Sequence, residues 1–116
     1  MARDDAVYVG LRGRQLAFGH GGPTVVGVRD DRGQRTLHKH PDARTLPDEF
    51  EWGYVGAGPG ALAEAILADR LGSSPDVRVS RAFMGDVVAR LGSEFELPGS
   101  HVDDWLSRRC ALHRPA

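Results

Sequence analysis

The sequence predicts an α+β protein in which about three helices from the C-terminal half pack on a small antiparallel sheet from the N-terminal half. Three observations support this fold class. The first half holds short β-rich runs separated by glycine turns, the second half holds apolar residues at helical spacing, and 116 residues suit one hydrophobic core. We therefore expect residues 1–116 to form a single small domain.

The expected strands follow one another from the N-terminus. Residues 7–11 and 15–18 are short β-rich runs, and residues 24–29 form a longer one. Residues 30–33 then predict a turn, because Gly33 suits a left-handed position, and residues 34–40 would return as the antiparallel partner. A hairpin is therefore expected near Gly33.

A connecting loop and one more strand are expected before the helices. Residues 41–47 hold two prolines and little periodic apolarity, which indicates a loop. Residues 49–54 follow as a short strand. On that strand Phe50, Trp52 and Tyr54 would share one face.

The first helix is expected from Pro59, which suits the first helical position because its missing N–H is not needed there. Gly72 is a fitting C-terminal stop. Apolar residues recur between them at the spacing of one helix face: Leu62, Ala63, Ile66, Leu67 and Leu71.

Two further helices are expected. Residues 76–79 read as a short extended piece, and Ser80 as the N-cap of a helix that Gly92 ends. Its buried face would hold Phe83, Met84, Val87, Val88 and Leu91. Residues 94–97 are compatible with a strand or a linker.

The last helix is expected to begin after Ser100, with Asp103 at the capping-box position. Val102, Trp105 and Leu106 would face inward, with Cys110 as a further candidate for that face. A packing role is therefore expected for Cys110.

Composition excludes several functional classes. With 41% hydrophobic and 27% charged residues the chain reads as soluble and globular, and a net charge of −1 gives no field that favours nucleic acid. One cysteine cannot form an internal disulfide or a multi-cysteine zinc site. No signal peptide and no membrane-spanning run is expected, so we predict a cytoplasmic protein without a membrane partner.

The most informative stretch is residues 50–63, FEWGYVGAGPGALA, which contains the glycine pattern G-x-G-x-x-G/A. A dinucleotide-binding Rossmann unit is disfavoured because the preceding strand is not aliphatic and no ribose-binding acid stands about 20 residues further on. A glycine loop before a helix can still bind an anion through backbone N–H groups at the positive end of the helix dipole. The competing interpretation is that the glycines only allow a tight corner.

The candidate ligand-binding residues all belong to this stretch. Trp52 or Tyr54 would stack on a base or sugar, although three aromatics on one face are also typical of a core stripe. Glu51 could accept hydrogen bonds from a ligand. The full set is Glu51, Trp52, Tyr54, Gly56, Gly58, Gly60 and Ala61.

No catalytic or metal-binding set is expected. His38 and His40 share one face of the expected strand, with His20 and Asp42 as the only nearby candidates to complete a metal site. A solvated edge strand is the better interpretation. No serine stands in a G-x-S-x-G nucleophile elbow, and we predict no cofactor.

From residue 50 to residue 71 the chain resembles a family of short bacterial and phage domains, domain of unknown function 6166. The resemblance lies in the signature F-E-W-G-Y-x-G-x-G-P-x-x-L-A-x-A-I-L, which residues 50–67 carry. The chain departs from the family at residues 79–84, where a more aromatic, lysine-bearing segment is expected. The resemblance implies a small single-domain protein linked to phages or mobile elements and implies no activity.

Two functional hypotheses remain. The first is a non-enzymatic small binding protein that seats an anionic ligand or nucleotide at the glycine loop. The second is a protein-interaction module, an accessory or counter-defence factor that binds and blocks a host protein. An enzyme of another type would need ionisable groups converging in a cleft, and the sequence nominates only Glu51 and the histidines. Homo-oligomer formation stays open.

Overall fold

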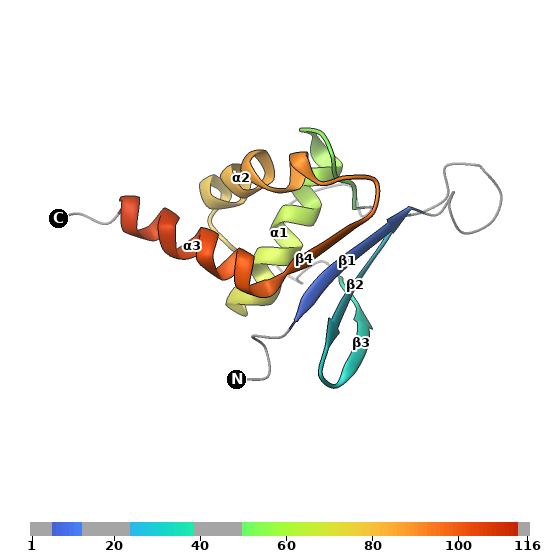
Figure 1. The fold of residues 1–116 in the computed structure, drawn as a ribbon. Coiled ribbons are helices and arrows are strands. Elements are labelled where there is room, and N and C mark those ends of the chain that lie inside the picture. Colours follow the sequence, from blue (N-terminus) through green and yellow to red (C-terminus); the bar gives the residue numbers. More distant parts are fainter. Residues whose placement is uncertain (1–5, 13–23, 39–49, 114–116) are drawn as a thin grey trace.

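The computed structural model describes residues 6–12, 24–38 and 50–113, and it confirms the α+β class (Figure 1). The expected strand at residues 15–18 lies outside these ranges. The elements in chain order are β1 (Val7–Arg12), β2 (Thr24–Asp30), β3 (Gly33–Thr36), α1 (Ala57–Leu71), α2 (Val77–Asp86), the short 3-10 helix η3 (Val88–Arg90), β4 (Phe95–Pro98) and α3 (Gly99–His113).

The sheet has the strand order β3-β2-β1-β4, and each neighbouring pair is antiparallel. The predicted hairpin is confirmed, with Gly33 at a φ of 123°. Tyr8, the second residue of β1, pairs with Val28 on one side and with Leu97 on the other. The sheet is therefore completed by β4, a strand from the C-terminal half that the sequence left open as strand or linker.

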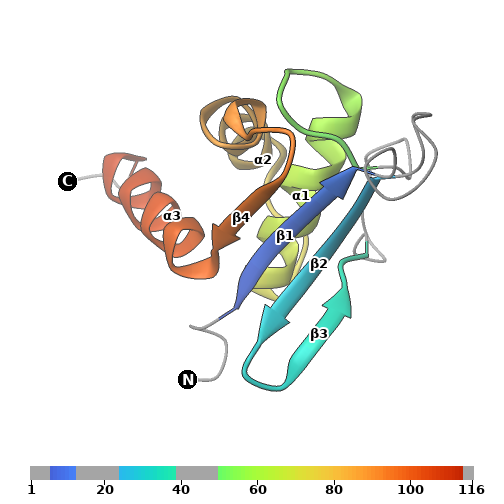
Figure 2. The same cartoon turned by 45° about the vertical axis from the view of Figure 1, so that its right-hand side comes forward.

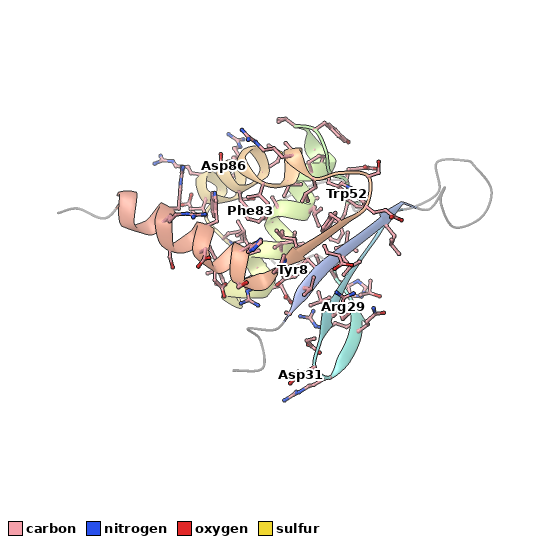
Figure 3. All side chains as sticks on the ribbon, in the orientation of Figure 1. Tyr8, Arg29, Asp31, Trp52, Phe83 and Asp86 are labelled. Atoms are coloured by element: carbon pink, nitrogen blue, oxygen red, sulfur yellow. The ribbon has the colours of Figure 1, made fainter. Side chains whose placement is uncertain are left out.

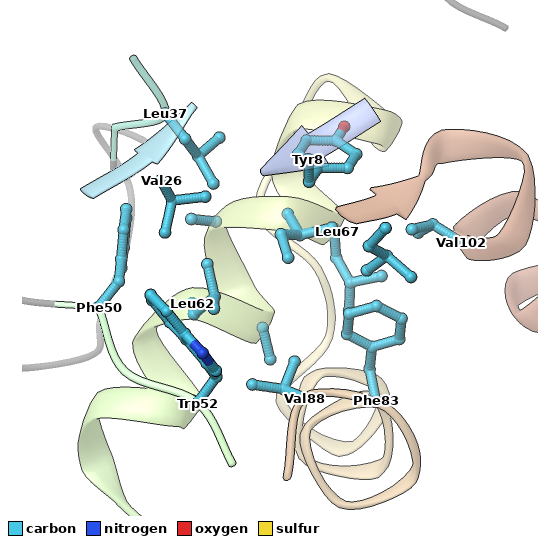
Figure 4. Close-up of a cluster of buried hydrophobic side chains, with 14 of the residues drawn as sticks. Tyr8, Val26, Leu37, Phe50, Trp52, Leu62, Leu67, Phe83, Val88 and Val102 are labelled. Atoms are coloured by element: carbon cyan, nitrogen blue, oxygen red, sulfur yellow. The ribbon is translucent and has the colours of Figure 1, made fainter. Parts of the chain in front are cut away.

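The three α-helices lie on one side of the sheet (Figures 1 and 2). Helix α1 is buried along its whole middle, residues 61–68, because it lies between the sheet and the other helices. Leu62 and Leu67 stand between Val26 of β2 and Phe83 of α2 (Figure 4). The buried side chains form one core cluster to which both the sheet and the helices contribute.

The end of α1 is as predicted and its start is not. Gly72 has a φ of 79° and its N–H donates to the Ala68 carbonyl at 2.7 Å, which is the expected C-terminal stop. The helix begins at Ala57, so Pro59 is its third residue and not its first. Leu71, expected on the buried face, is half-exposed.

The expected starts of the other two helices were wrong. The Asp76 carboxylate accepts the Arg78 N–H at 2.7 Å and caps α2 at Val77, so there is no extended piece at residues 76–79 and Ser80 is not the cap. Helix α3 begins at Gly99. Asp103 is paired with Arg70 of α1, whose Nε donates to Asp103 Oδ1 at 3.0 Å.

A polar cluster ties the sheet to the C-terminal end of α1. The Tyr8 hydroxyl donates to Asp69 Oδ2 at 2.6 Å, and Arg35 Nη2 of β3 donates to both oxygens of the same carboxylate at 2.9 and 3.0 Å. Burial, with the Asp69 carboxylate beside it, raises the pKa of the Tyr8 phenol, so this group stays a hydrogen-bond donor. The cluster fixes α1 against two strands.

Across the described ranges, none of the helices has the length and apolarity needed to cross a membrane. Cys110 lies outside the residues whose side chains the structure describes.

Candidate functional site

Residues 50–56 lead into α1 and form neither helix nor strand, so the strand expected at 49–54 is wrong within the described residues 50–54. Phe50 and Trp52 both enter the core, while Glu51 N–H donates to the Gly58 carbonyl at 3.3 Å. The chain thus folds back along the first turn of α1. Gly53, at a φ of 89°, then turns it away from the core.

The Trp52 indole is fully buried and hydrogen-bonded (Figure 4). Its Nε1 donates to the Ser93 carbonyl at 3.1 Å, and its ring meets the Phe95 ring edge to face with centroids 4.9 Å apart. This side chain belongs to the core and does not face solvent. Of the two aromatics considered for stacking on a ligand, only Tyr54 lies at the surface.

Gly58 is a packing residue. It is buried, and a Cβ atom added there would lie 2.8 Å from Glu51 Cβ and 3.1 Å from Glu51 Cγ. Gly60 donates its N–H to the Gly56 carbonyl at 2.9 Å, and Ala61 is fully buried. These contacts favour the tight-corner interpretation of the glycines, because close approach of the chain to itself requires Gly58.

The exposed part of this segment is the tip loop, which we define as residues 53–57. Tyr54 is 50% exposed and Val55 is 67% exposed. The loop is held at its base, where Gly53 N–H donates to the Val88 carbonyl at 3.0 Å. Sequence reasoning missed Val55, because its exposure depends on how residues 50–56 fold back along the first turn of α1.

The start of α1 has features that favour a bound anion and one feature that opposes it. The first turn of the helix holds no acidic residue, and the N-cap Gly56 supplies no side-chain hydrogen bond. Both features leave room for an anion. However, the Glu51 side chain passes directly beside Gly58, so an anion seated there would approach a carboxylate-bearing residue.

The structure brings five of the seven predicted ligand residues to one corner, where Glu51, Tyr54, Gly56, Gly58 and Gly60 adjoin, and it buries Trp52 and Ala61 in the core. Within the described ranges no group of three or more His, Cys, Asp or Glu side chains could hold a metal ion. His38 is exposed and lies beyond the end of β3, while His20, His40 and Asp42 lie outside the described residues.

The comparisons with known proteins identify a family and no function. A family model described as "Family of unknown function (DUF6166)" matches residues 8–108. The match confirms the resemblance seen in residues 50–71 and extends it to both the sheet and α3. No match was found among curated proteins or solved structures.

Proposed function

The chain belongs to this DUF6166 family of unknown function, and from its geometry we propose that it is a non-enzymatic protein-interaction module whose tip loop docks on a partner protein. The observation that carries the proposal is the exposure of Tyr54 and Val55, adjacent apolar side chains on a loop that is hydrogen-bonded at its base.

The tip loop has the properties of an anchor for an interface. Core residues on both sides fix it, because Trp52 before it and Pro59 after it are buried. A loop that is already ordered loses little conformational entropy on binding. Tyrosine is also one of the residue types that dominate binding energy in interfaces. Burying the Val55 side chain in a partner would contribute about 1.5–3 kcal/mol.

The partner that fits is a protein with an apolar pocket. The resemblance implies a protein linked to phages or mobile elements, and we propose that it is an accessory or counter-defence factor that acts by blocking a host protein. A half-exposed tyrosine beside a valine is suited to such a pocket, since it offers apolar area together with one hydroxyl.

Affinity capture with tip-loop variants tests this function. We expect a partner retained by the parent protein to be lost with Val55→Asp and with Tyr54→Ala, each with an affinity loss of about tenfold to a hundredfold. The matched control is Val77→Asp at the start of α2, where the side chain is 59% exposed. All three sites are at the surface, so the unfolding free energy should change by only about 0.5 kcal/mol. Equal retention by parent and Val55→Asp, or equal loss with Val77→Asp, contradicts the proposal.

The second candidate is a small anionic ligand or nucleotide at the start of α1, favoured by the absence of acidic residues and of a side-chain cap there. A thermal-shift screen of nucleotides and simple anions tests it. A ligand at about 100 times its Kd would add roughly 2.7 kcal/mol of stability. We expect Ala57→Glu to abolish the shift and Ala57→Gln to keep it, because Ala57 is exposed and only the first variant adds charge. A panel that leaves the parent unshifted rejects this candidate.

A further inference from the structure

Strand β3 is an edge strand of the sheet, because the strand order is β3-β2-β1-β4. Figure 2 shows it as the last strand on the side away from α3. All four of its residues are exposed, and among the described residues it pairs with β2 alone. In Figure 3, Arg29 and Asp31 mark the β2–β3 hairpin, which lies toward the opposite end of the molecule from Trp52, the residue before the tip loop. Within the described ranges the outer edge of β3 is therefore unpaired.

The main-chain groups at this edge follow from the pairing of β3 with β2. The Leu37 N–H donates to the Val26 carbonyl at 2.8 Å, so these two residues form a hydrogen-bonded pair. In an antiparallel ladder such pairs alternate with pairs that do not bond to each other. Arg35 therefore bonds to β2, whereas the N–H and C=O groups of Gln34 and Thr36 point away from it. These are the groups that a further strand would bind.

The edge of β3 lacks the features that keep many sheet edges from pairing. Such edges often carry a proline, a lysine or an inward-pointing charge. The other edge strand, β4, contains Pro98, which has no N–H to donate, whereas β3 contains neither proline nor lysine. Arg35 is the one charged residue of β3, and its Nη2 donates to both oxygens of the Asp69 carboxylate of α1. Its charge is therefore compensated within the molecule.

We infer that a second copy of the chain binds this edge, so that β3 of one copy pairs antiparallel with β3 of the other across a two-fold axis. The open groups can meet their own copies in symmetric registers centred on Gln34, Arg35 or Thr36. A centre at Gln34 runs into the hairpin turn, and a centre at Arg35 sets two like charges opposite each other, which is destabilising.

The register centred on Thr36 has neither fault. It pairs threonine with threonine, a favourable cross-strand pair, and it sets Arg35 of one copy opposite Leu37 of the other. In this register the strand is complementary to itself, which favours a second copy over an unrelated strand. This inference is independent of the tip loop and goes beyond the proposed function.

Sedimentation velocity and amide hydrogen exchange test the inference. We expect a monomer–dimer equilibrium with a Kd between about 1 μM and about 1 mM, because a contact along one short strand is small. The Gln34 and Thr36 amides should exchange more slowly as the protein concentration rises. The Arg35 amide is the internal reference, since its hydrogen bond to β2 protects it in monomer and dimer alike.

A charge swap at Thr36 tests the register. Thr36 is exposed and would face its own copy, so Thr36→Lys places two lysines opposite each other and should raise the Kd about fivefold or more. Thr36→Glu should do the same, while an equimolar mixture of the two variants should give a heterodimer in native mass spectrometry. Thr36→Val keeps the β-branched side chain, and Ser107→Lys adds the same charge at an exposed position of α3. Both controls should leave the Kd unchanged.

A far-UV circular dichroism spectrum establishes that each variant is folded. The inference is overturned if the parent protein stays monomeric up to about 1 mM. It is also overturned if Thr36→Lys dimerises as tightly as the parent, if Ser107→Lys weakens the dimer as much as Thr36→Lys does, or if the mixed lysine and glutamate variants form no heterodimer.

Discussion

Replacing Trp52 by alanine is expected to lower the free energy of unfolding by about 3–5 kcal/mol. The indole is fully buried, it packs edge to face on Phe95, and its Nε1–H is bonded to the Ser93 carbonyl. The substitution removes all of these contacts and leaves a cavity. Domains of this kind have only about 5–15 kcal/mol of stability in total, so the variant should be partly or fully unfolded near 37 °C.

Urea unfolding followed by far-UV circular dichroism measures this effect. Trp52→Phe is the informative comparison, because it keeps an aromatic ring and loses the hydrogen bond to Ser93. We expect it to cost less than half as much as alanine. If Trp52→Ala changes the unfolding free energy by about 1 kcal/mol or less, the indole does not anchor the segment that carries the tip loop.

The second large effect is expected at Gly10 of β1. A Cβ atom added to Gly10 would lie 2.1 Å from Phe95 Cε2 and 2.6 Å from Phe95 Cδ2, far inside van der Waals contact. Phe95 pairs with Gly10 across the strands and is itself held by Trp52, so its ring has little freedom to move. Gly10→Ala should therefore cost about 1–3 kcal/mol, the usual range for overpacking, or more.

Gly27→Ala in the neighbouring strand is the matched control. A Cβ atom there would come no closer than 3.4 Å to any atom, the nearest being the Arg35 carbonyl oxygen, and we expect little change in stability. The double variant Gly10→Ala with Phe95→Leu should be more stable than the sum of the single changes predicts, because the smaller side chain removes the clash. Additive costs would show that the Phe95 ring is not the cause.

Local signals account for the parts of the fold that could be predicted. The hairpin at Gly33 and the stop at Gly72 both depend on glycine adopting a positive φ, which is a property of the residue itself. The apolar spacing in α1 marked a helix correctly, since Leu62, Ile66 and Leu67 are all buried.

Contacts between distant residues account for the errors. Residues 50–54 alternate like a strand, yet Trp52 is drawn into the core by Phe95 and Ser93, which come some forty positions later. Asp103 was expected at the capping-box position of the last helix, but it pairs with Arg70 of α1. Neither partner can be inferred from local pattern.

The geometry of the candidate site could be predicted from the sequence only in part. The close approach of Gly58 to Glu51, and the exposure of Val55, depend on how the chain folds back and could not be read from the residues.

The pairing of β1 with β4 has a consequence for how the chain is made. Strand β1 is synthesised early but cannot complete its pairing until residues 95–98 have been synthesised, because Tyr8 and its neighbours pair with these residues. Such distant pairing slows folding, and until β4 arrives one side of β1 is an open edge that other chains can join. A chain cut short before Phe95 should therefore accumulate as aggregate and not as a smaller folded protein.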